Sequence, residues 1–127
     1  MNRIMPALAA AGVLIVTVAA NAWADGDVAK GKRVFNKCKT CHELTTAKNK
    51  IGPTLQGVIG RKAGTVPGFK YSSAMQNSGI VWDEKTIQQY IADPKKLVPG
   101  NKMVLAPIKK EDQREDVVAY IKEQQKK

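Results

Sequence analysis

One pentapeptide, Cys38-Lys39-Thr40-Cys41-His42, contains both cysteines and the only histidine of the 127-residue chain. Two thiols three residues apart can each bond to one vinyl group of a single porphyrin. The imidazole that follows directly can then ligate the iron from one face of the ring. This segment therefore predicts covalent attachment of one haem through Cys38 and Cys41, with His42 as an iron ligand.

The same residue types occur in three other kinds of site. A disulfide or a pair of buried thiols needs only the two cysteines, and a thioredoxin-like redox pair has the same spacing. A structural zinc site usually has four nitrogen or sulfur ligands, whereas this pentapeptide offers three. A redox pair does not require an adjacent histidine and usually follows a strand, whereas the residues before Cys38 indicate a helix. Haem attachment fits the pattern best.

The first 24 residues have the features of a secretory signal peptide. Arg3 provides a short positive start, residues 7–20 form an uncharged and mostly apolar run, and Ala22 and Ala24 are small residues where a signal peptidase cleaves. The apolar run is shorter than the roughly 18 residues of a membrane-spanning helix, and an uncleaved anchor is the alternative. We expect cleavage after Ala24, export to the periplasm and one mature domain, residues 25–127.

The mature segment is patterned as helices joined by long loops, and no convincing strand pattern is found. Residues 43–65 show no periodicity and contain four glycines, which predicts a loop. The fold class is therefore all-α. The expected helical segments are a first helix from Asp27 to about Cys38, a short turn over 71–76, a helix over 84–92 capped by Asp83 and ended by Asp93-Pro94, a further turn over 94–98, and a last helix from about Lys110.

Two of these helices should present an apolar face to the core. Spacings of three and four residues define each face, and a glycine on the first would let another helix approach closely. The face of the first helix consists of Val28, Gly31, Val34, Phe35 and Cys38. The face of the last helix consists of Arg114, Val117, Val118, Tyr120 and Ile121.

Several further blocks accompany the pentapeptide in a fixed order. They are Gly26–Phe35, Gly52–Leu55, Gly60–Gly64, Pro67–Tyr71, Gly79–Trp82, Asp93–Lys96, Val98–Met103 and Asp116–Ile121. With these blocks the chain resembles a class I cytochrome c, of the small soluble bacterial type that is similar to mitochondrial cytochrome c. The resemblance covers nearly all of residues 25–127. It implies N- and C-terminal helices packed together, with short helices and loops around one covalently bound haem.

A second iron ligand follows partly from counting. Within residues 25–127 the only methionines are Met75 and Met103. Met103 follows Pro99-Gly100, a turn that can aim a side chain inward, and it occupies the position of the family's methionine ligand. A methionine is more often a core residue, and this stays the interpretation of Met75. Lys102 is the alternative ligand if Met103 dissociates at high pH.

The resemblance also assigns residues around the haem. A carbonyl would accept a hydrogen bond from the ligand histidine and orient its ring. A buried tyrosine or tryptophan needs a hydrogen-bond partner, which a haem propionate could provide, although an ordinary core role is the alternative. The assigned residues are Pro53 beside His42, Tyr90 near the Met103 sulfur, and Tyr71, Trp82 and Arg61 at an inner propionate.

Some positions depart from the mitochondrial pattern. Met75 stands where an asparagine often joins an internal polar network. Asn101 replaces a threonine at the foot of the loop that carries Met103, called the methionine loop below. Leu105 replaces an aromatic residue and Pro107 a glycine. The loop before Gly52 lacks a histidine that many relatives have. The ligands are unaffected, whereas the stability of the methionine loop stays open.

Ligation by a histidine and a methionine would occupy both axial positions of the iron, leaving none for oxygen or a substrate. A soft thioether also favours ferrous iron and raises the reduction potential. These properties suit the transport of one electron in a respiratory chain and not catalysis, so an electron carrier and not an enzyme is expected. A haem-based peroxidase or a gas or redox sensor is the alternative, and it would need an open distal site.

The net charge of +10 points to acidic partners. A positive field at the exposed haem edge would speed encounter with an acidic surface on a membrane redox complex, such as a bc-type complex, a terminal oxidase or a photosynthetic reaction centre. An anionic membrane surface is a secondary partner, nucleic acid is disfavoured, and a monomer is expected. By family position the lysines at this edge are Lys37, Lys39, Lys50, Lys95, Lys96, Lys102, Lys109 and Lys110.

Overall fold

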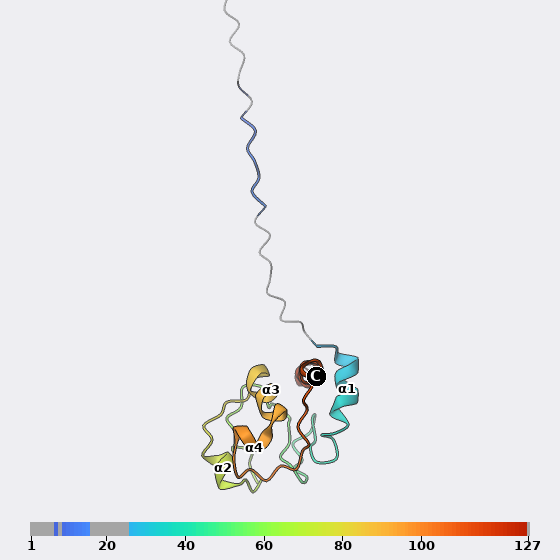
Figure 1. The fold of residues 1–127 in the computed structure, drawn as a ribbon, viewed down its shortest axis with the longest axis vertical. Coiled ribbons are helices and arrows are strands. Elements are labelled where there is room, and N and C mark those ends of the chain that lie inside the picture. The colour runs from blue at the N-terminus through green and yellow to red at the C-terminus, as the bar shows by residue number, and fades with distance from the viewer. Residues whose placement is uncertain (1–6, 8, 16–25, 127) are drawn as a thin grey trace, which may run out of the picture.

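A computed structural model of the chain describes residues 7, 9–15 and 26–126. The folded part contains five helices and no sheet, because its only pairing of extended backbone is one antiparallel bridge, between Lys62 and Val81. The helices are α1 (Val28–Phe35), α2 (Ser73–Gln76), α3 (Glu84–Ala92), α4 (Pro94–Leu97) and α5 (Glu111–Gln125), and Figure 1 shows their arrangement. The prediction of an all-α fold is confirmed.

The predicted signal peptide lies largely outside the described residues, and its cleavage site after Ala24 lies wholly outside them. In the part of the chain that the structure describes, no helix has the length and apolar character that a membrane span requires.

Local capping interactions explain where most helices begin. The Asp27 carboxylate accepts the Lys30 N–H at 2.9 Å at the start of α1. At the start of α3, the carboxylate of Asp83 accepts the Thr86 N–H at 2.8 Å, while the Thr86 hydroxyl accepts the Asp83 N–H at 2.8 Å. Asp93 ends α3 and caps α4. The predicted bounds of α3 are therefore confirmed.

Three predicted helices are longer than the observed ones. The first helix was expected to reach about Cys38 but ends at Phe35, because the next residues form tighter turns, in which the Cys38 N–H bonds the Phe35 carbonyl at 2.8 Å. The predicted turn over 71–76 becomes helical only from Ser73, after the Ser72 hydroxyl caps it. The segment predicted over 94–98 ends at Leu97.

The first and last helices pack directly against each other (Figure 1). Gly31 makes this possible, since a Cβ atom at this position would overlap the backbone carbonyl of Asp116 in α5. The rings of Phe35 and Tyr120 lie 5.5 Å apart across the same contact. Val28, although expected on the inner face, is 39% exposed at the first position of α1.

On α5 the predicted inner face is confirmed for three residues, because Val117, Val118 and Ile121 are buried. The side chain of Arg114 is half-buried and donates to the carbonyls of Ile108 and Lys109, each at 2.8 Å. These bonds hold the chain that leads into the helix.

Side chains tie the long loops to one another. Asn49 donates to the Pro67 carbonyl at 3.1 Å and accepts the Thr54 N–H at 3.0 Å. The Gln125 amide, in the last turn of α5, accepts the Gly57 N–H at 2.5 Å and donates to the Leu55 carbonyl at 3.2 Å. These bonds hold the loop segments in place without a sheet.

Replacement of Gly31 tests the close helix contact. We expect Gly31→Val to lower the free energy of unfolding by about 2 kcal/mol or more, because the new side chain would force α1 away from α5. Lys32→Val is the matched control, since it adds the same β-branched residue at an exposed position of the same helix. Thermal unfolding of the two variants provides the measurement, and equal losses would contradict the packing role of Gly31.

Candidate haem site

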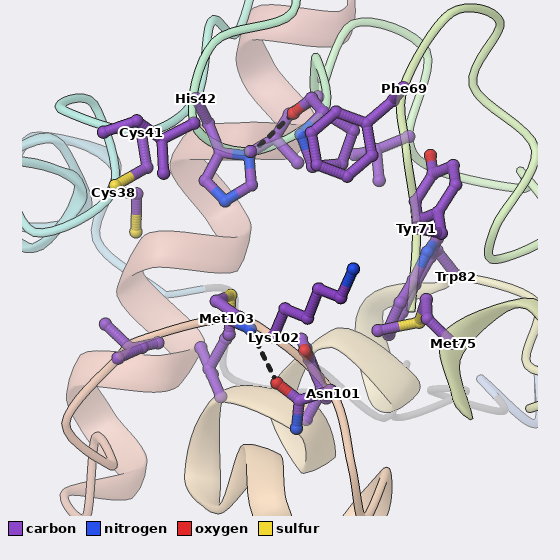
Figure 2. A pocket seen from close by; sticks show the side chains of 18 of the residues that line it. Cys38, Cys41, His42, Phe69, Tyr71, Met75, Trp82, Asn101, Lys102 and Met103 are labelled. Carbon is purple, nitrogen blue, oxygen red and sulfur yellow. Dashed lines mark hydrogen bonds between the residues drawn. The ribbon is translucent and has the colours of Figure 1, made fainter. Parts of the chain in front are cut away.

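A largely apolar cavity of about 310 Å³ lies inside the ring of loops. Figure 2 shows Cys38, Cys41 and His42 at one side of it, with Met103 facing them from the methionine loop. The nine residues predicted to bind the cofactor all line this cavity, although they come from separate parts of the chain. They are Cys38, Cys41, His42, Pro53, Arg61, Tyr71, Trp82, Tyr90 and Met103.

The imidazole of His42 is oriented by its surroundings. Its Nδ1 lies 2.7 Å from the carbonyl oxygen of Pro53, and a hydrogen bond to a carbonyl requires the proton on Nδ1. Burial lowers the pKa of His42, and the charges of Arg61 and Lys50 lower it further, against the opposing effect of the Pro53 carbonyl. The ring is therefore neutral near pH 7, and its Nε2 lone pair is available to a metal.

Gly52 provides the space in which this ring lies. A Cβ atom at Gly52 would lie only 2.7 Å from Nδ1 and 2.8 Å from Nε2 of His42. The Gly52 N–H also donates to the Cys41 carbonyl at 2.8 Å, which joins the two segments beside the histidine. Backbone and side-chain contacts thus hold the imidazole in one orientation.

The two cysteines are half-buried and are not joined to each other. Burial, reinforced by Cys41 and opposed by Lys37, raises the pKa of the Cys38 thiol to about 11. A redox-active pair needs a thiol with a lowered pKa, because the thiolate is the nucleophile. The burial that raises this pKa disfavours the thioredoxin-like alternative and agrees with thiols that bond to a buried partner.

Both methionines line the cavity, but they lie at different ends of it. Figure 2 shows Met103 opposite His42, and Met75 beside Trp82 at the far end. Met75 is buried within the core cluster, and Met103 is half-buried and packed against it. Of the two, Met103 is the methionine that lies across the cavity from His42 (Figure 2).

The charged residues of the cavity are all positive. Lys37, Arg61, Lys70 and Lys102 line it, and among the described residues that line it none is an aspartate or glutamate. Arg61 is held by two carbonyls, those of Thr54 at 2.9 Å and Gln56 at 3.0 Å. Two thiols, a neutral imidazole, apolar walls and surplus positive charge together fit a haem, which brings an iron and two propionates.

The eight lysines predicted to bind partners are all exposed. Of these, Lys37 and Lys102 line the cavity, and Figure 2 shows Lys102 reaching into it. Lys50 is engaged within the chain, since its amine donates to the Lys39 carbonyl at 2.8 Å and lies 3.7 Å from the Glu43 carboxylate. Lys50 thus also joins the two segments beside His42.

Sequence reasoning missed part of the lining. Ile87 and Ile91 were detectable, because with Tyr90 they recur at spacings of three and four along α3. Lys70 and Phe69 lie in a loop without periodicity, and although the block Pro67–Tyr71 contains them, only Tyr71 of that block was assigned to the cofactor. Two exposed apolar residues also line the cavity without such a signal: Ile51 is 77% and Val104 is 97% exposed.

Known proteins show which family this architecture belongs to. The family model described as cytochrome c matches residues 28–125. The chain is 50% identical over 103 residues to cytochrome c2 from Rhodomicrobium vannielii, covering 80% of this chain and 82% of that one. It is 53% identical over 97 residues to cytochrome c-550 from Nitrobacter winogradskyi, covering 76% and 89%.

A solved structure agrees with these sequence matches. Cytochrome cH from Methylobacterium extorquens superposes with a TM-score of 0.73 at 45% identity, covering 77% of this chain and 99% of that one. The residues matched by the family model include Cys38 and Cys41, and they also include the packed helices α1 and α5. The chain belongs to the cytochrome c family: it carries one covalent haem c through Cys38 and Cys41, and it is an electron carrier, not an enzyme.

Proposed function

We propose that the protein is a soluble periplasmic carrier of one electron, with His42 and Met103 as the two axial ligands of the haem iron. The observation that carries this proposal is the placement of the two side chains on facing sides of one cavity (Figure 2). With both axial positions taken by the protein, the iron has no open position for a substrate. Electron transfer then needs little rearrangement of the site.

Each ligand contributes differently to the redox chemistry. When bound, the haem supplies a one-electron couple at its iron. The Pro53 carbonyl strengthens His42 as a donor, because the hydrogen bond at 2.7 Å increases electron density on the ring. The Met103 thioether is a soft ligand that favours the ferrous state. The apolar walls act in the same direction, since a low-dielectric site disfavours the extra positive charge of ferric iron.

The proposed propionate contacts are supported by spare hydrogen-bond donors. The Tyr71 hydroxyl accepts the Val66 N–H at 3.0 Å, so its own proton is free to be donated to a carboxylate. Arg61 has five N–H donors and uses two nitrogens for carbonyls, which leaves donors for a second partner. Trp82 lines the same cavity with its ring 5.1 Å from that of Tyr90.

Tyr90 would act on the methionine through packing and through its hydroxyl. Burial raises the pKa of Tyr90 to about 12, so its hydroxyl stays protonated over the physiological range. Tyr90 is buried in the core cluster against which Met103 packs. A neutral hydroxyl in this place can donate a hydrogen bond to the thioether without adding a charge to the site.

Export and partners complete the proposal. The signal-like residues 1–24 support delivery to the periplasm, where the mature domain would move between membrane redox complexes. The exposed lysines support docking to acidic surfaces of a bc-type complex, a terminal oxidase or a photosynthetic reaction centre. Such complexes should be weak and short-lived, because a carrier must leave after each transfer.

Replacement of either cysteine tests covalent attachment. We expect Cys38→Ala or Cys41→Ala to reduce the yield of covalent haem sharply, because each thiol holds one vinyl carbon. Acid–acetone extraction of protein from an export-competent host measures the bound fraction. Full extraction of the haem from the wild-type protein would contradict the covalent linkage.

Replacement of the two methionines tests the axial ligand. We expect Met103→Ala to open the iron to imidazole or cyanide and to lower the reduction potential, within the roughly 0.8 V range that axial ligands span. Met75→Leu, the matched control in the same cavity, should leave the ferric protein low-spin. Spectroscopy of the ferric state distinguishes the variants. A high-spin Met75→Leu protein beside an unchanged Met103→Ala protein would mean that the wrong methionine is assigned.

Charge reversal tests the docking surface. We expect Lys95→Glu and Lys96→Glu to slow electron transfer to a purified bc-type complex several-fold at low salt, with little change in midpoint potential because exposed charges are screened. Lys126→Glu makes the same change at the C-cap of α5 and should matter less. Stopped-flow rates over a salt series provide the comparison. Equal effects from all three variants would show that net charge, and not a docking surface, controls encounter.

A further inference from the structure

We infer that Asn101 is the residue that positions Met103 for ligation, by tying the methionine loop, residues 101–107, to the short helix α4. The inference rests on the proposed ligation by His42 and Met103, and it concerns how this chain keeps the thioether in place. The sequence marks Asn101 only as a replacement for threonine at the foot of this loop.

The side chain of Asn101 makes three hydrogen bonds. Its Nδ2 donates to the carbonyl of Pro94 at 2.9 Å and to that of Val98 at 2.8 Å. Its Oδ1 accepts the backbone N–H of Met103 at 2.9 Å, which is the dashed line in Figure 2. Asn101 is half-buried and lines the cavity itself.

The remainder of the loop has few other restraints. Within the described residues 26–126, residues 102–107 make no hydrogen bond other than the one from the Met103 N–H to Asn101. Backbone bonding stops at the Asn101 N–H, which bonds Val98 at 3.1 Å, and resumes at the Ile108 N–H, which bonds Ile91 at 2.9 Å. The Asn101 side chain therefore supplies the single hydrogen-bond tether of a six-residue span, in which Met103 and Leu105 also pack against the core cluster.

Only an amide can make this set of contacts. Asparagine combines two N–H donors with a carbonyl acceptor, so it can bond the carbonyls of Pro94 in α4 and of its C-cap Val98 together with one backbone N–H. A threonine hydroxyl has one proton to donate and could not satisfy both carbonyls. The network also assigns the amide orientation, since the opposite orientation would place Oδ1 against two carbonyl oxygens and Nδ2 against an N–H.

Loss of this tether should show as easier replacement of Met103 by an external ligand. Binding of imidazole to the iron requires Met103 to be dissociated, so the apparent dissociation constant varies inversely with the dissociated fraction. Removing buried hydrogen bonds from a loop held by little else would increase that fraction. We expect about tenfold tighter binding of imidazole to ferric Asn101→Ala than to the wild type.

Two variants and one matched control make the test specific. Asn101→Asp is nearly isosteric and keeps an acceptor for the Met103 N–H. It loses both donors, to Pro94 in α4 and to its C-cap Val98, so it should also bind imidazole more tightly. Asn49→Ala removes side-chain hydrogen bonds of similar number from a loop beside the histidine, and should destabilise the protein without tightening imidazole binding. Optical titration of the purified ferric holoproteins measures the dissociation constants.

The outcomes separate the inference from the proposal on which it rests. If Met103→Ala binds imidazole no more tightly than the wild type, Met103 is not a ligand and the proposed function fails. If Met103→Ala binds tightly while both Asn101 variants match the wild type, only the inference fails. Wild-type affinity in Asn101→Asp alone would overturn the tie to α4, and tighter binding by Asn49→Ala would indicate general loosening instead of positioning.

Discussion

The close contact between the first and last helices is the constraint on which the remaining architecture depends. Because Gly31 has no side chain, the backbones of α1 and α5 come so close that a Cβ atom would not fit between them. The contact joins residues almost ninety positions apart, since the Asp27 N–H donates to the Asp116 carboxylate. The pair fixes both ends of the chain's long loops. The segment with the two cysteines leaves α1 directly, and Ile121 of α5 lines the cavity beside it. The contact between α1 and α5 thus positions one wall of the cavity.

Outside the contact between α1 and α5, side-chain hydrogen bonds hold the backbone of the loops, as the hydrogen bonds between strands would in a sheet. Most of the chain between residues 36 and 110 is loop, so its backbone groups lack regular partners. Amides and a guanidinium supply them: Asn49, Asn101 and Gln125 each bond two or more backbone groups, and Arg61 binds two carbonyls. These bonds connect segments that no helix joins. They also leave the site dependent on a few residues, which gives single polar side chains an influence over the ligands.

Positive charges act at short range inside the cavity and at longer range on the surface of this molecule. Within the cavity, Arg61 and three lysines face a cofactor that carries carboxylates, and no acidic side chain competes with them. Outside it, exposed lysines create a field that extends over about a Debye length, roughly 8 Å at physiological salt. Lys50 has a structural role as well, because its amine bonds the Lys39 carbonyl and pairs with Glu43 beside His42. The positive residues therefore do not form one uniform surface: some line the cavity, some are exposed, and Lys50 also holds chain segments together.

The sequence alone was sufficient for features whose causes are local. The cysteines and the histidine lie within five residues of one another because they serve one porphyrin and its iron, and the cap at Asp83 depends on a residue three positions away. The pentapeptide and the family resemblance together named nine residues, all of which line one cavity. The tertiary structure alone decided the rest: Lys70 in the lining, the end of α1 at Phe35, the exposed Ile51 and Val104, and the bonds of Asn49, Asn101 and Gln125. The physical reason is that loops have no periodicity, and a polar side chain's partners are chosen by where the folded chain brings backbone groups, not by its neighbours in sequence.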